Sequence, residues 1–193
     1  MTDMKKVKDH YFHKAKQEGY PARSVYKLKE AQNKYRFLKK GQRVLDLGAS
    51  PGAWTKYAWQ VVGRKGQVFS VDLKPLSARP PSVIFIQQDV FALDLGDLRG
   101  FDVVLSDMAP STTGRRDVDH VRQIGLAERA LEIAQTVLLP GGDFFCKVFE
   151  GQELLSFRRA CEQCFKKVRV FKPKSSRSES VELFLLCSSL ISN

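Results

Sequence analysis

The run DFFCKVF contains one lysine, Lys147, among apolar residues typical of a buried strand. An ammonium group is costly to bury without a partner, because burial lowers the pKa of a lysine whereas nearby carboxylates raise it. A lysine at a strand end beside an acid can therefore be tuned toward work as a general base. Considered alone, Lys147 is better explained as an exposed strand lysine whose ammonium group reaches solvent.

Two acids occupy the ends of other apolar runs. Asp107 follows the run FDVVLS, and Glu182 lies near the start of the last run, SVELFLL. We expect Asp107 at the same carboxyl edge of a parallel sheet as Lys147, where open α/β sheets carry their ligands. Glu182 by itself fits a solvated strand terminus better, since acids are mostly exposed. Together with Lys147, the two acids point to a site for proton transfer.

A turn of small residues follows the first apolar run, VLDL. It contains Gly48, Ser50, Pro51 and Gly52 and leads into a predicted helix. Small residues let a ligand approach the backbone closely, and the carboxyl end of a strand is where doubly wound sheets bind nucleotides. Asp72 closes the second apolar run 20 residues after Gly52, an offset at which a carboxylate can accept hydrogen bonds from ribose hydroxyls. This pattern predicts a cofactor that contains adenosine.

Two cofactors fit that description, a dinucleotide and S-adenosylmethionine. A dinucleotide fingerprint has the form GxGxxG, with a helix N-terminus that holds pyrophosphate, whereas the turn here reads GASPG and lacks the middle glycine. S-adenosylmethionine has no phosphate to hold, so the turn favours it. Asp89, just after the third run, is then expected beside the adenine, with Phe91 near enough to pack. The alternative for Asp89 is a turn or capping residue.

The predicted elements alternate between strands and helices. Seven short apolar runs bounded by turn residues are predicted strands: Arg43–Leu47, Gln67–Val71, Val83–Gln87, Phe101–Ser106, Asp143–Val148, Val168–Phe171 and Val181–Cys187. Helical spacing predicts four helices: Ala22–Tyr35, Trp54–Val62, Val118–Leu139 and Gln152–Phe165. This order predicts an α/β fold with a mostly parallel sheet and helices on both faces.

The composition limits the class of protein. The chain has 193 residues, 43% of them hydrophobic, which predicts a single globular domain over residues 1–193. Its net charge of +11 suits a polyanionic partner, although charge alone cannot separate RNA from DNA, and solubility is the simpler alternative. No apolar run approaches the roughly 20 residues that span a bilayer. We expect a cytoplasmic protein that is not bound to a membrane, and a monomer.

The four cysteines do not form a recognisable metal site. Cys161 and Cys164 form one CxxC pair, but no second ligand pair follows, and the histidines are not spaced to supply it. We therefore expect no bound metal and reduced, mostly buried thiols.

The first forty residues are rich in basic side chains interleaved with aromatic ones. Phosphates attract cations and unstacked bases pack on aromatic rings, so residues 1–40 are predicted to be a basic, helical extension that contributes to RNA binding. The alternative is an ordinary solvated helix face with core aromatics. The residues concerned are Lys5, Lys6, Lys8, Lys14, Lys16, Arg23, Lys27, Lys34, Arg36, Lys39 and Lys40, with Tyr11, Phe12, Tyr20 and Tyr26.

Seven separate motifs, in order along nearly the whole chain, resemble the FtsJ/RrmJ family of RNA ribose 2′-O-methyltransferases. They are RSVYKLKE, DLGASPGAW, VDL, QQDV, VLSDMAPS with TG shortly after, LLPGGDFFCKVFEG and KPKSSRSESVELFLL. The sequence departs from the family in Ser50, in Ala53, and in a shorter stretch before Tyr11. The resemblance implies a Rossmann-like S-adenosylmethionine-dependent methyltransferase fold with a seven-stranded sheet whose last strand is antiparallel.

The resemblance also implies the roles of individual residues. A catalytic lysine, aspartate, lysine and glutamate match Lys27, Asp107, Lys147 and Glu182. The implied contacts to S-adenosylmethionine come from the turn with its Trp54, from the motifs VDL and QQDV, and from the acid after the fourth strand: Gly48, Ser50, Pro51, Gly52, Trp54, Asp72, Leu73, Asp89, Val90 and Asp107.

The implied reaction is 2′-O-methylation of a ribose in a structured RNA. A uridine of 23S-type large-subunit ribosomal RNA is favoured because the chain carries no appended RNA-recognition module and suits a preassembled particle. Transfer RNA is the alternative substrate. A non-catalytic RNA-binding assembly factor and a nicotinamide-dependent reductase are the alternatives of other classes, and the four catalytic residues and the turn, respectively, argue against them.

Overall fold

The computed structural model describes residues 2–77, 79–110, 114–176 and 180–191, with side chains from residue 10 onward apart from those of 116 and 117. Seven strands form one sheet in the order β3-β2-β1-β4-β5-β7-β6. Strands β1 to β5 pair in parallel, and β7 is antiparallel to both of its neighbours. The strands are β1 Arg43–Leu47, β2 Gln67–Asp72, β3 Ile84–Gln87, β4 Phe101–Ser106, β5 Leu138–Phe149, β6 Phe165–Phe171 and β7 Glu182–Leu190.

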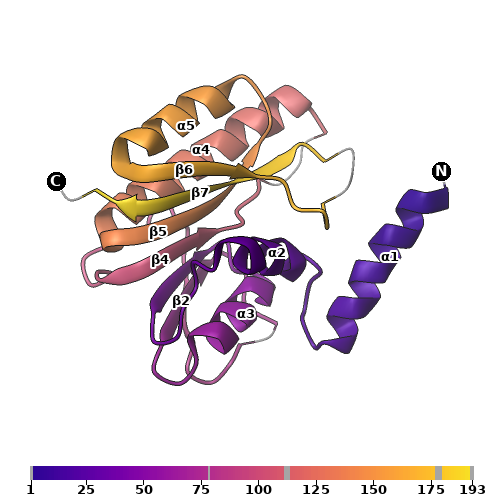
Figure 1. Cartoon of the computed structure of the whole chain (residues 1–193), viewed down its shortest axis with the longest axis horizontal. Coiled ribbons are helices and arrows are strands. Elements are labelled where there is room, and N and C mark those ends of the chain that lie inside the picture. Colours follow the sequence, from indigo (N-terminus) through magenta and orange to yellow (C-terminus); the bar gives the residue numbers. More distant parts are fainter. Residues whose placement is uncertain (1, 78, 111–113, 177–179, 192–193) are drawn as a thin grey trace.

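Helices cover both faces of the sheet, as predicted (Figure 1). Residues of α2 and α3 pack in one hydrophobic cluster with one face of the sheet, and residues of α4 and α5 pack in a second cluster with the other. No helix in the described part of the chain is long and apolar enough to cross a membrane. The helices are α1 Thr2–Gln17, α2 Val25–Tyr35, α3 Ala53–Val62, α4 Arg116–Val137 and α5 Glu153–Cys164.

The strand order reverses at β1 and β4, which lie side by side at the middle of the sheet. From β1 the chain continues outward to β2 and β3, and from β4 it continues outward to β5. Such a reversal leaves a crevice outside the carboxyl ends of the two strands, and ligands of open α/β sheets bind there. The turn after Leu47 and the segment after Ser106 both begin at this edge.

Strand β5 starts earlier than the apolar pattern predicts, at Leu138 instead of Asp143. Considered locally, Pro140-Gly141-Gly142 is a typical turn sequence. It forms instead an irregularity within the strand, because the pairing with β4 shifts between Phe101 and Val103. Gly141 takes a φ of 82° there, a backbone conformation that glycine adopts without steric cost.

An aromatic cluster lies under the carboxyl end of β5. The ring of Phe145 stacks on those of Trp54 and Phe184, with centroids 5.6 and 5.0 Å apart. Side chains two residues apart in a strand point to the same face, so Lys147 projects from β5 above Phe145. The cluster therefore supports the base of the site from the α2 and α3 side.

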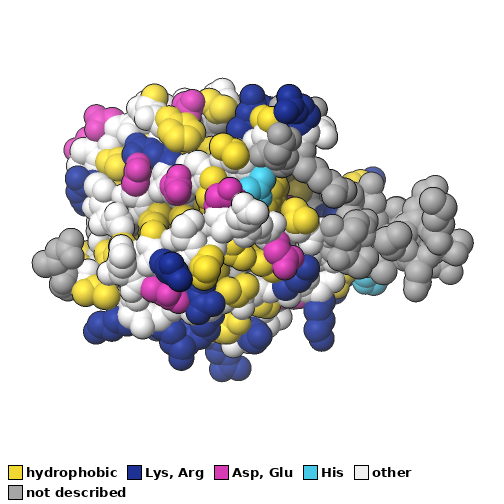
Figure 2. Space-filling view, turned by 90° about the horizontal axis from the view of Figure 1, so that it is seen from above, with side chains coloured by type: hydrophobic (Ala, Val, Ile, Leu, Met, Phe, Trp, Pro, Cys, Tyr) yellow, Lys and Arg dark blue, Asp and Glu magenta, His cyan; other side chains and the backbone are white. Residues whose placement is uncertain are grey.

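Helix α1 projects away from the sheet, and its C-terminal end leads through a short connection to α2 (Figure 1). On the molecular face in Figure 2, Lys and Arg side chains gather along the lower margin, whereas Asp and Glu side chains are spread among apolar ones. The positively charged side chains are therefore unevenly distributed over that face.

Candidate active site

Lys147 and Asp107 form an ion pair at the carboxyl edge of the sheet. The Nζ atom of Lys147 lies 3.0 Å from Oδ1 of Asp107 and donates a hydrogen bond of 2.8 Å to its backbone carbonyl. The side chain of Lys147 is only 4% exposed, and a charge buried in this way is strongly destabilising when its partner is missing. The explanation of Lys147 as a solvent-exposed strand lysine is therefore wrong.

Lys27 and Glu182 form a second ion pair. Lys27 lies in the first turn of α2 and donates to Oε2 of Glu182 at 2.7 Å. The hydroxyl of Ser180 donates to the same oxygen at 3.2 Å and accepts a bond from the Glu182 amide. Both charged side chains are largely buried, so Glu182 is not the solvated strand terminus that it would be in isolation.

The two ion pairs are neighbours. Lys147 on β5 lies directly opposite Phe184 on β7, and the Lys27 ammonium lies 5.8 Å from the centre of the Phe184 ring. Burial raises the pKa of the Glu182 carboxyl, but the Lys27 ammonium, reinforced by the charge of Lys147, outweighs burial and holds that pKa below its usual range. The structure thus brings the four residues into one group of two cations and two anions, and Glu182 is ionised at neutral pH.

The turn after β1 is held against both neighbouring strands. The amide of Ser50 donates to Oδ2 of Asp72 at 2.9 Å, and Gly52, the N-cap of α3, has a φ of 109°. A side chain at Gly48 would collide with Met108, whose Cγ lies 2.6 Å from the position of an added Cβ. The glycine thus lets the turn after β1 and the segment after β4 approach each other closely.

Several predicted cofactor residues lie at this edge with accessible groups. Asp72 accepts a second bond from the amide of Lys74 at 2.8 Å, and each carboxylate oxygen retains a lone pair for a further donor. Leu73, beside it, is 64% exposed. An exposed leucine next to an anchored carboxylate provides an apolar contact and a hydrogen-bond acceptor for a nucleoside.

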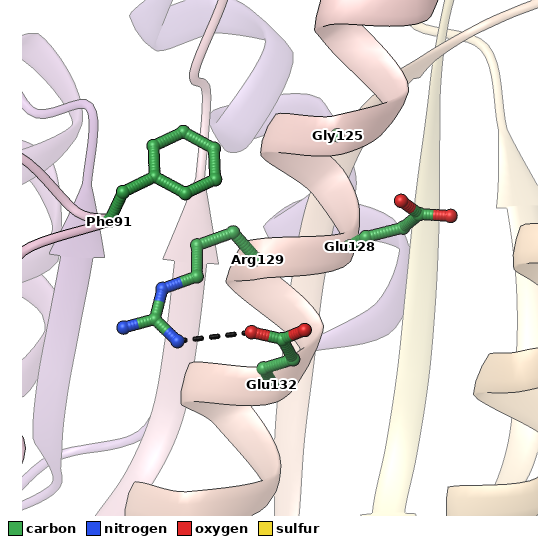
Figure 3. A pocket seen from close by; sticks show the side chains of 5 residues that line it. All are labelled: Phe91, Gly125, Glu128, Arg129 and Glu132. Atoms are coloured by element: carbon green, nitrogen blue, oxygen red, sulfur yellow. Dashed lines mark hydrogen bonds and ion pairs between the residues drawn. The ribbon is translucent and has the colours of Figure 1, made fainter.

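Asp89 forms a turn. Its Oδ1 accepts the amide of Phe91 at 3.0 Å, which is the capping role considered as the alternative to adenine binding. Val90 is buried, and its carbonyl accepts a bond from Arg129 of α4 at 2.9 Å. Phe91, expected near the adenine, lines a pocket with residues of α4 (Figure 3).

The side chain of Trp54 lies in the core. It is almost completely buried, and its indole N–H donates to the carbonyl of Ser24 at 2.9 Å. Any contact of Trp54 with a cofactor must therefore come from its backbone. The sequence showed the tryptophan at a binding turn but could not show which way the ring points.

Most of the aromatic side chains of the N-terminal segment pack within the protein, which contradicts the prediction that they are available to stack on RNA bases. Tyr20 and Tyr26 are buried, and the Lys29 ammonium lies 4.3 Å and 5.3 Å from the centres of their rings. Tyr11 packs on Tyr26, with ring centroids 5.1 Å apart. These rings attach α1 to α2 and are not free to stack on bases, whereas Phe12 is exposed. The side chains of Lys5, Lys6 and Lys8 lie outside the described residues.

Comparison with known families gives one match that spans most of the chain. The model of the family described as FtsJ-like methyltransferase matches residues 20–190. The chain belongs to the FtsJ-like methyltransferase family. The resemblance inferred from the seven motifs is therefore confirmed, and the molecule is a methyltransferase.

Relatives of this methyltransferase span nearly its whole length. Proteins named ribosomal RNA large subunit methyltransferase E from Syntrophobacter fumaroxidans and Desulfatibacillum aliphaticivorans are 50% and 48% identical, over 93% of this chain and 94% and 89% of theirs. A crystal structure described as a ribosomal RNA methyltransferase from Plasmodium falciparum superposes with a TM-score of 0.79 at 26% identity, covering 90% of this chain and all of that one. A SAM-dependent O-methyltransferase from Thermotoga maritima, 13% identical, shares the fold with a TM-score of 0.57 over 81% of this chain and 62% of that one.

The crevice of this FtsJ-like methyltransferase is lined by acids, which suits a cationic ligand. The pKa of Asp46, near the end of β1, is raised to about 7: burial is the main cause, the bond from Thr55 lowers the pKa, and the charges of Asp107 and Asp72 raise it. The Oδ1 atom of Asp46 meets no hydrogen-bond donor among the described residues. Asp46 itself is completely buried, and Asp72 and Asp107 are the acids at the edge of the crevice. A pyrophosphate would be repelled by these carboxylates, whereas a sulfonium and an ammonium would be attracted. The residues present therefore fit S-adenosylmethionine better than a dinucleotide.

Sequence reasoning missed Glu30, which ties α2 to the loop before β7. Its two carboxylate oxygens accept the backbone amides of Lys174 and Ser175 at 2.7 and 2.9 Å. Glu30 lies one turn after Lys27 on α2, so the helix holds both the loop and Glu182. No local pattern marks this contact, because 144 positions separate Glu30 from Lys174.

We predict that Asp46→Asn changes how stability depends on pH. A buried carboxyl with a raised pKa binds its proton more tightly in the folded than in the unfolded protein. Its contribution to the free energy of unfolding is therefore complete below the unfolded pKa near 4. This contribution is lost as pH rises toward 7, by at most about 1.4 kcal/mol per pH unit. The asparagine does not titrate. The melting temperature of the cofactor-free variant, relative to that of the cofactor-free wild type, should therefore be higher at pH 8 than at pH 5. The exposed Asp94→Asn is the control, and a difference that is the same at both pH values would contradict this explanation.

We also predict that Glu30→Ala loosens the loop that leads to Glu182. Hydrogen bonds to a carboxylate hold the Lys174 and Ser175 amides, so their loss should increase local opening and give several-fold faster trypsin cleavage after Lys174. Limited proteolysis followed by mass spectrometry measures this rate. Glu132→Ala, which removes an exposed pair with Arg129, should leave it unchanged. Equal cleavage of wild type and Glu30→Ala would show that the loop does not depend on Glu30.

Proposed function

We propose that this methyltransferase transfers a methyl group from S-adenosylmethionine to a ribose 2′-hydroxyl of large-subunit ribosomal RNA. The target is a uridine of 23S-type ribosomal RNA. The observation that carries the proposal is the group of two neighbouring ion pairs, Lys147 with Asp107 and Lys27 with Glu182, beside the acid-lined crevice. A ribose hydroxyl is a poor nucleophile at neutral pH. The site must therefore orient this hydroxyl and receive its proton.

Each member of the group has a distinct task in this proposal. Lys147 contacts the 2′-hydroxyl: as an ammonium it polarises the O–H bond, and as a neutral amine, after losing a proton to solvent, it accepts the hydroxyl proton while the oxygen takes the methyl group from sulfur. Asp107 fixes the orientation and charge of Lys147 through the contacts at 3.0 and 2.8 Å. Glu182 adds the second negative charge that balances the site. Lys27 holds the reacting ribose or its phosphate, because its ammonium is already oriented by Glu182 and is less buried than that of Lys147.

The cofactor residues lie around the crevice between β1 and β4. When bound, S-adenosylmethionine supplies a methyl group that is already activated by the positive charge on sulfur. Asp72 would accept bonds from its ribose, Leu73 would pack on its adenine beside Asp89 and Val90, and Asp107 would lie near its methionine end. The turn from Gly48 to Gly52 would contact it through backbone groups, because its glycines present no side chain.

The substrate class rests on charge and on the relatives. The net charge of +11 suits a phosphate backbone, and residues 1–40 would contribute to RNA binding within a single methyltransferase domain that spans 1–193. Further basic residues would extend this surface: Arg115, Arg116, Lys172, Lys174 and Arg177. The side chains of Arg116 and Arg177 lie outside the described residues. The names of the relatives refer to ribosomal RNA of the large subunit, which supports this substrate over transfer RNA. We propose that the protein acts in the cytoplasm as a monomer.

The reaction and its substrate are tested with labelled cofactor. Purified protein is incubated with S-adenosylmethionine carrying a labelled methyl group and with separated ribosomal subunits, free ribosomal RNA or total transfer RNA. We expect label in large-subunit RNA, recovered after digestion as 2′-O-methyluridine. Label in transfer RNA only would show that transfer RNA, and not ribosomal RNA, is the substrate. Absence of transfer to any RNA would favour a non-catalytic assembly factor.

The role of Lys147 is tested by Lys147→Ala. The variant should lose at least two decades of kcat, the usual share of general base catalysis, because the 2′-hydroxyl loses the amine that contacts it. Its affinity for S-adenosylmethionine, measured by calorimetry, should stay within a few fold of the wild type. Equal losses of rate and of cofactor affinity would mean that Lys147 has a structural role only.

A further inference from the structure

Gln123 on α4 holds the backbone of β5 at the point where Lys147 projects. Its Nε2 donates to the carbonyl of Lys147 at 2.8 Å, and its Oε1 accepts the amide of Phe149 at 3.0 Å. The residue is only 1% exposed. Both ends of its amide are thus paired with backbone groups that lie on either side of Val148.

These two backbone groups lie beyond the end of the neighbouring strand. The last pair between β4 and β5 is Ser106 with Cys146. The chain then leaves β5, because the amide of Asp107 donates to the carbonyl of Leu47 on β1 at 3.3 Å. The side-chain amide of Gln123 has the same donor and acceptor as a peptide group, so it continues the ladder of hydrogen bonds where β4 stops.

A second contact from α4 fixes the segment that follows. The ring of His120, one turn before Gln123, contacts Glu153 at the start of α5. The same ring packs so closely on Gly151 that an added Cβ would lie 2.2 Å from it. The first turns of α4 therefore hold the chain from Lys147 to Glu153 at two points, from the face opposite α2.

We propose that Gln123 is a positioning residue for the methyl transfer: by holding the backbone of Lys147 and Phe149, it sets the direction in which the Lys147 ammonium meets Asp107 and the substrate. This inference rests on the proposed function of Lys147. It gives α4 a role in catalysis, because Gln123 holds the backbone of β5 and the four charged residues do not. Small displacements of a reacting group can cost about a hundredfold in rate, so a fixed backbone matters here.

The test compares Gln123→Leu with a variant of similar stability. Gln123→Leu leaves the Phe149 amide without its partner and the Lys147 carbonyl with only the weak thiol donor of Cys146 at 3.2 Å. We expect kcat to fall about tenfold to a hundredfold while the KM for S-adenosylmethionine changes less than twofold. Ile133→Ala, a buried change further along α4, should lower the melting temperature without altering kcat of the folded protein. Equal kcat in Gln123→Leu and wild type would overturn the inference.

Gln123→Glu separates positioning from simple loss of stability. A protonated glutamic acid can donate to the Lys147 carbonyl and accept from the Phe149 amide, but its carboxylate has no donor and repels the carbonyl. The activity of this variant relative to the wild type should therefore be highest at low pH and fall as the carboxyl ionises with rising pH. A pH profile parallel to that of the wild type would contradict the inference.

Hydrogen exchange gives a result that does not depend on activity. The Phe149 amide should exchange faster in Gln123→Leu than in the wild type, whereas the amides in the β5–β7 ladder should keep their protection. If the wild type transfers no methyl group, the proposed function fails, and unchanged exchange at Phe149 would show separately that Gln123 does not hold the strand end.

Discussion

The site depends on the rule that charges are buried only in pairs. Lys147 is 4% exposed, and an unpaired ammonium in such a place would cost several kcal/mol. Asp107 therefore has to be fixed within contact distance, and its own charge needs the same balance. The pair of Lys27 and Glu182, close enough for Lys147 to affect the Glu182 carboxyl, meets the same requirement. The strands and helices around the site hold these four charged side chains in place.

The direction of the strands explains why residues so far apart in the chain meet. In a parallel sheet the carboxyl ends of β1, β4 and β5 share one edge, which places Gly48, Asp107 and Lys147 together. Strand β7 runs the other way, so its first residue, Glu182, lies at that same edge, paired with Phe149. The antiparallel strand thus delivers an acid from its beginning to a site built from the ends of its neighbours. Helix α2 adds Lys27 from one face, and α4 adds Gln123 from the other.

Much of the fold could be predicted from the sequence, because its signals are local. The apolar runs gave the strands of the sheet within a few residues for most elements, and small residues after VLDL marked the turn at the crevice. The irregularity in β5 was missed because Pro140, Gly141 and Gly142 read locally as a turn. Alternation of strands and helices was enough to predict helices on both faces, as a parallel sheet requires.

The details of the site were harder to predict, because they depend on contacts between distant segments. Lys27 and Glu182 are 155 positions apart, and only the resemblance to a family joined them. Glu30 and Gln123 lie on helices where nothing in the local pattern distinguishes them from other polar residues. The tyrosines of the first thirty positions looked available to RNA, yet Tyr20 and Tyr26 are needed to attach α1 to the body. Composition shows which groups are present, but packing decides which of them remain free.

The central claim is that the two ion pairs work as one unit, and a double-mutant cycle on the two acids tests it most directly. Asp107→Asn and Glu182→Gln each remove one negative charge from a different pair with little change of shape. Single-turnover rates with saturating cofactor are measured for both single variants and for the double variant. Residues that act as a unit show strongly non-additive effects, so the double variant should be scarcely slower than the slower single variant. Losses that multiply would show two independent pairs and contradict the claim.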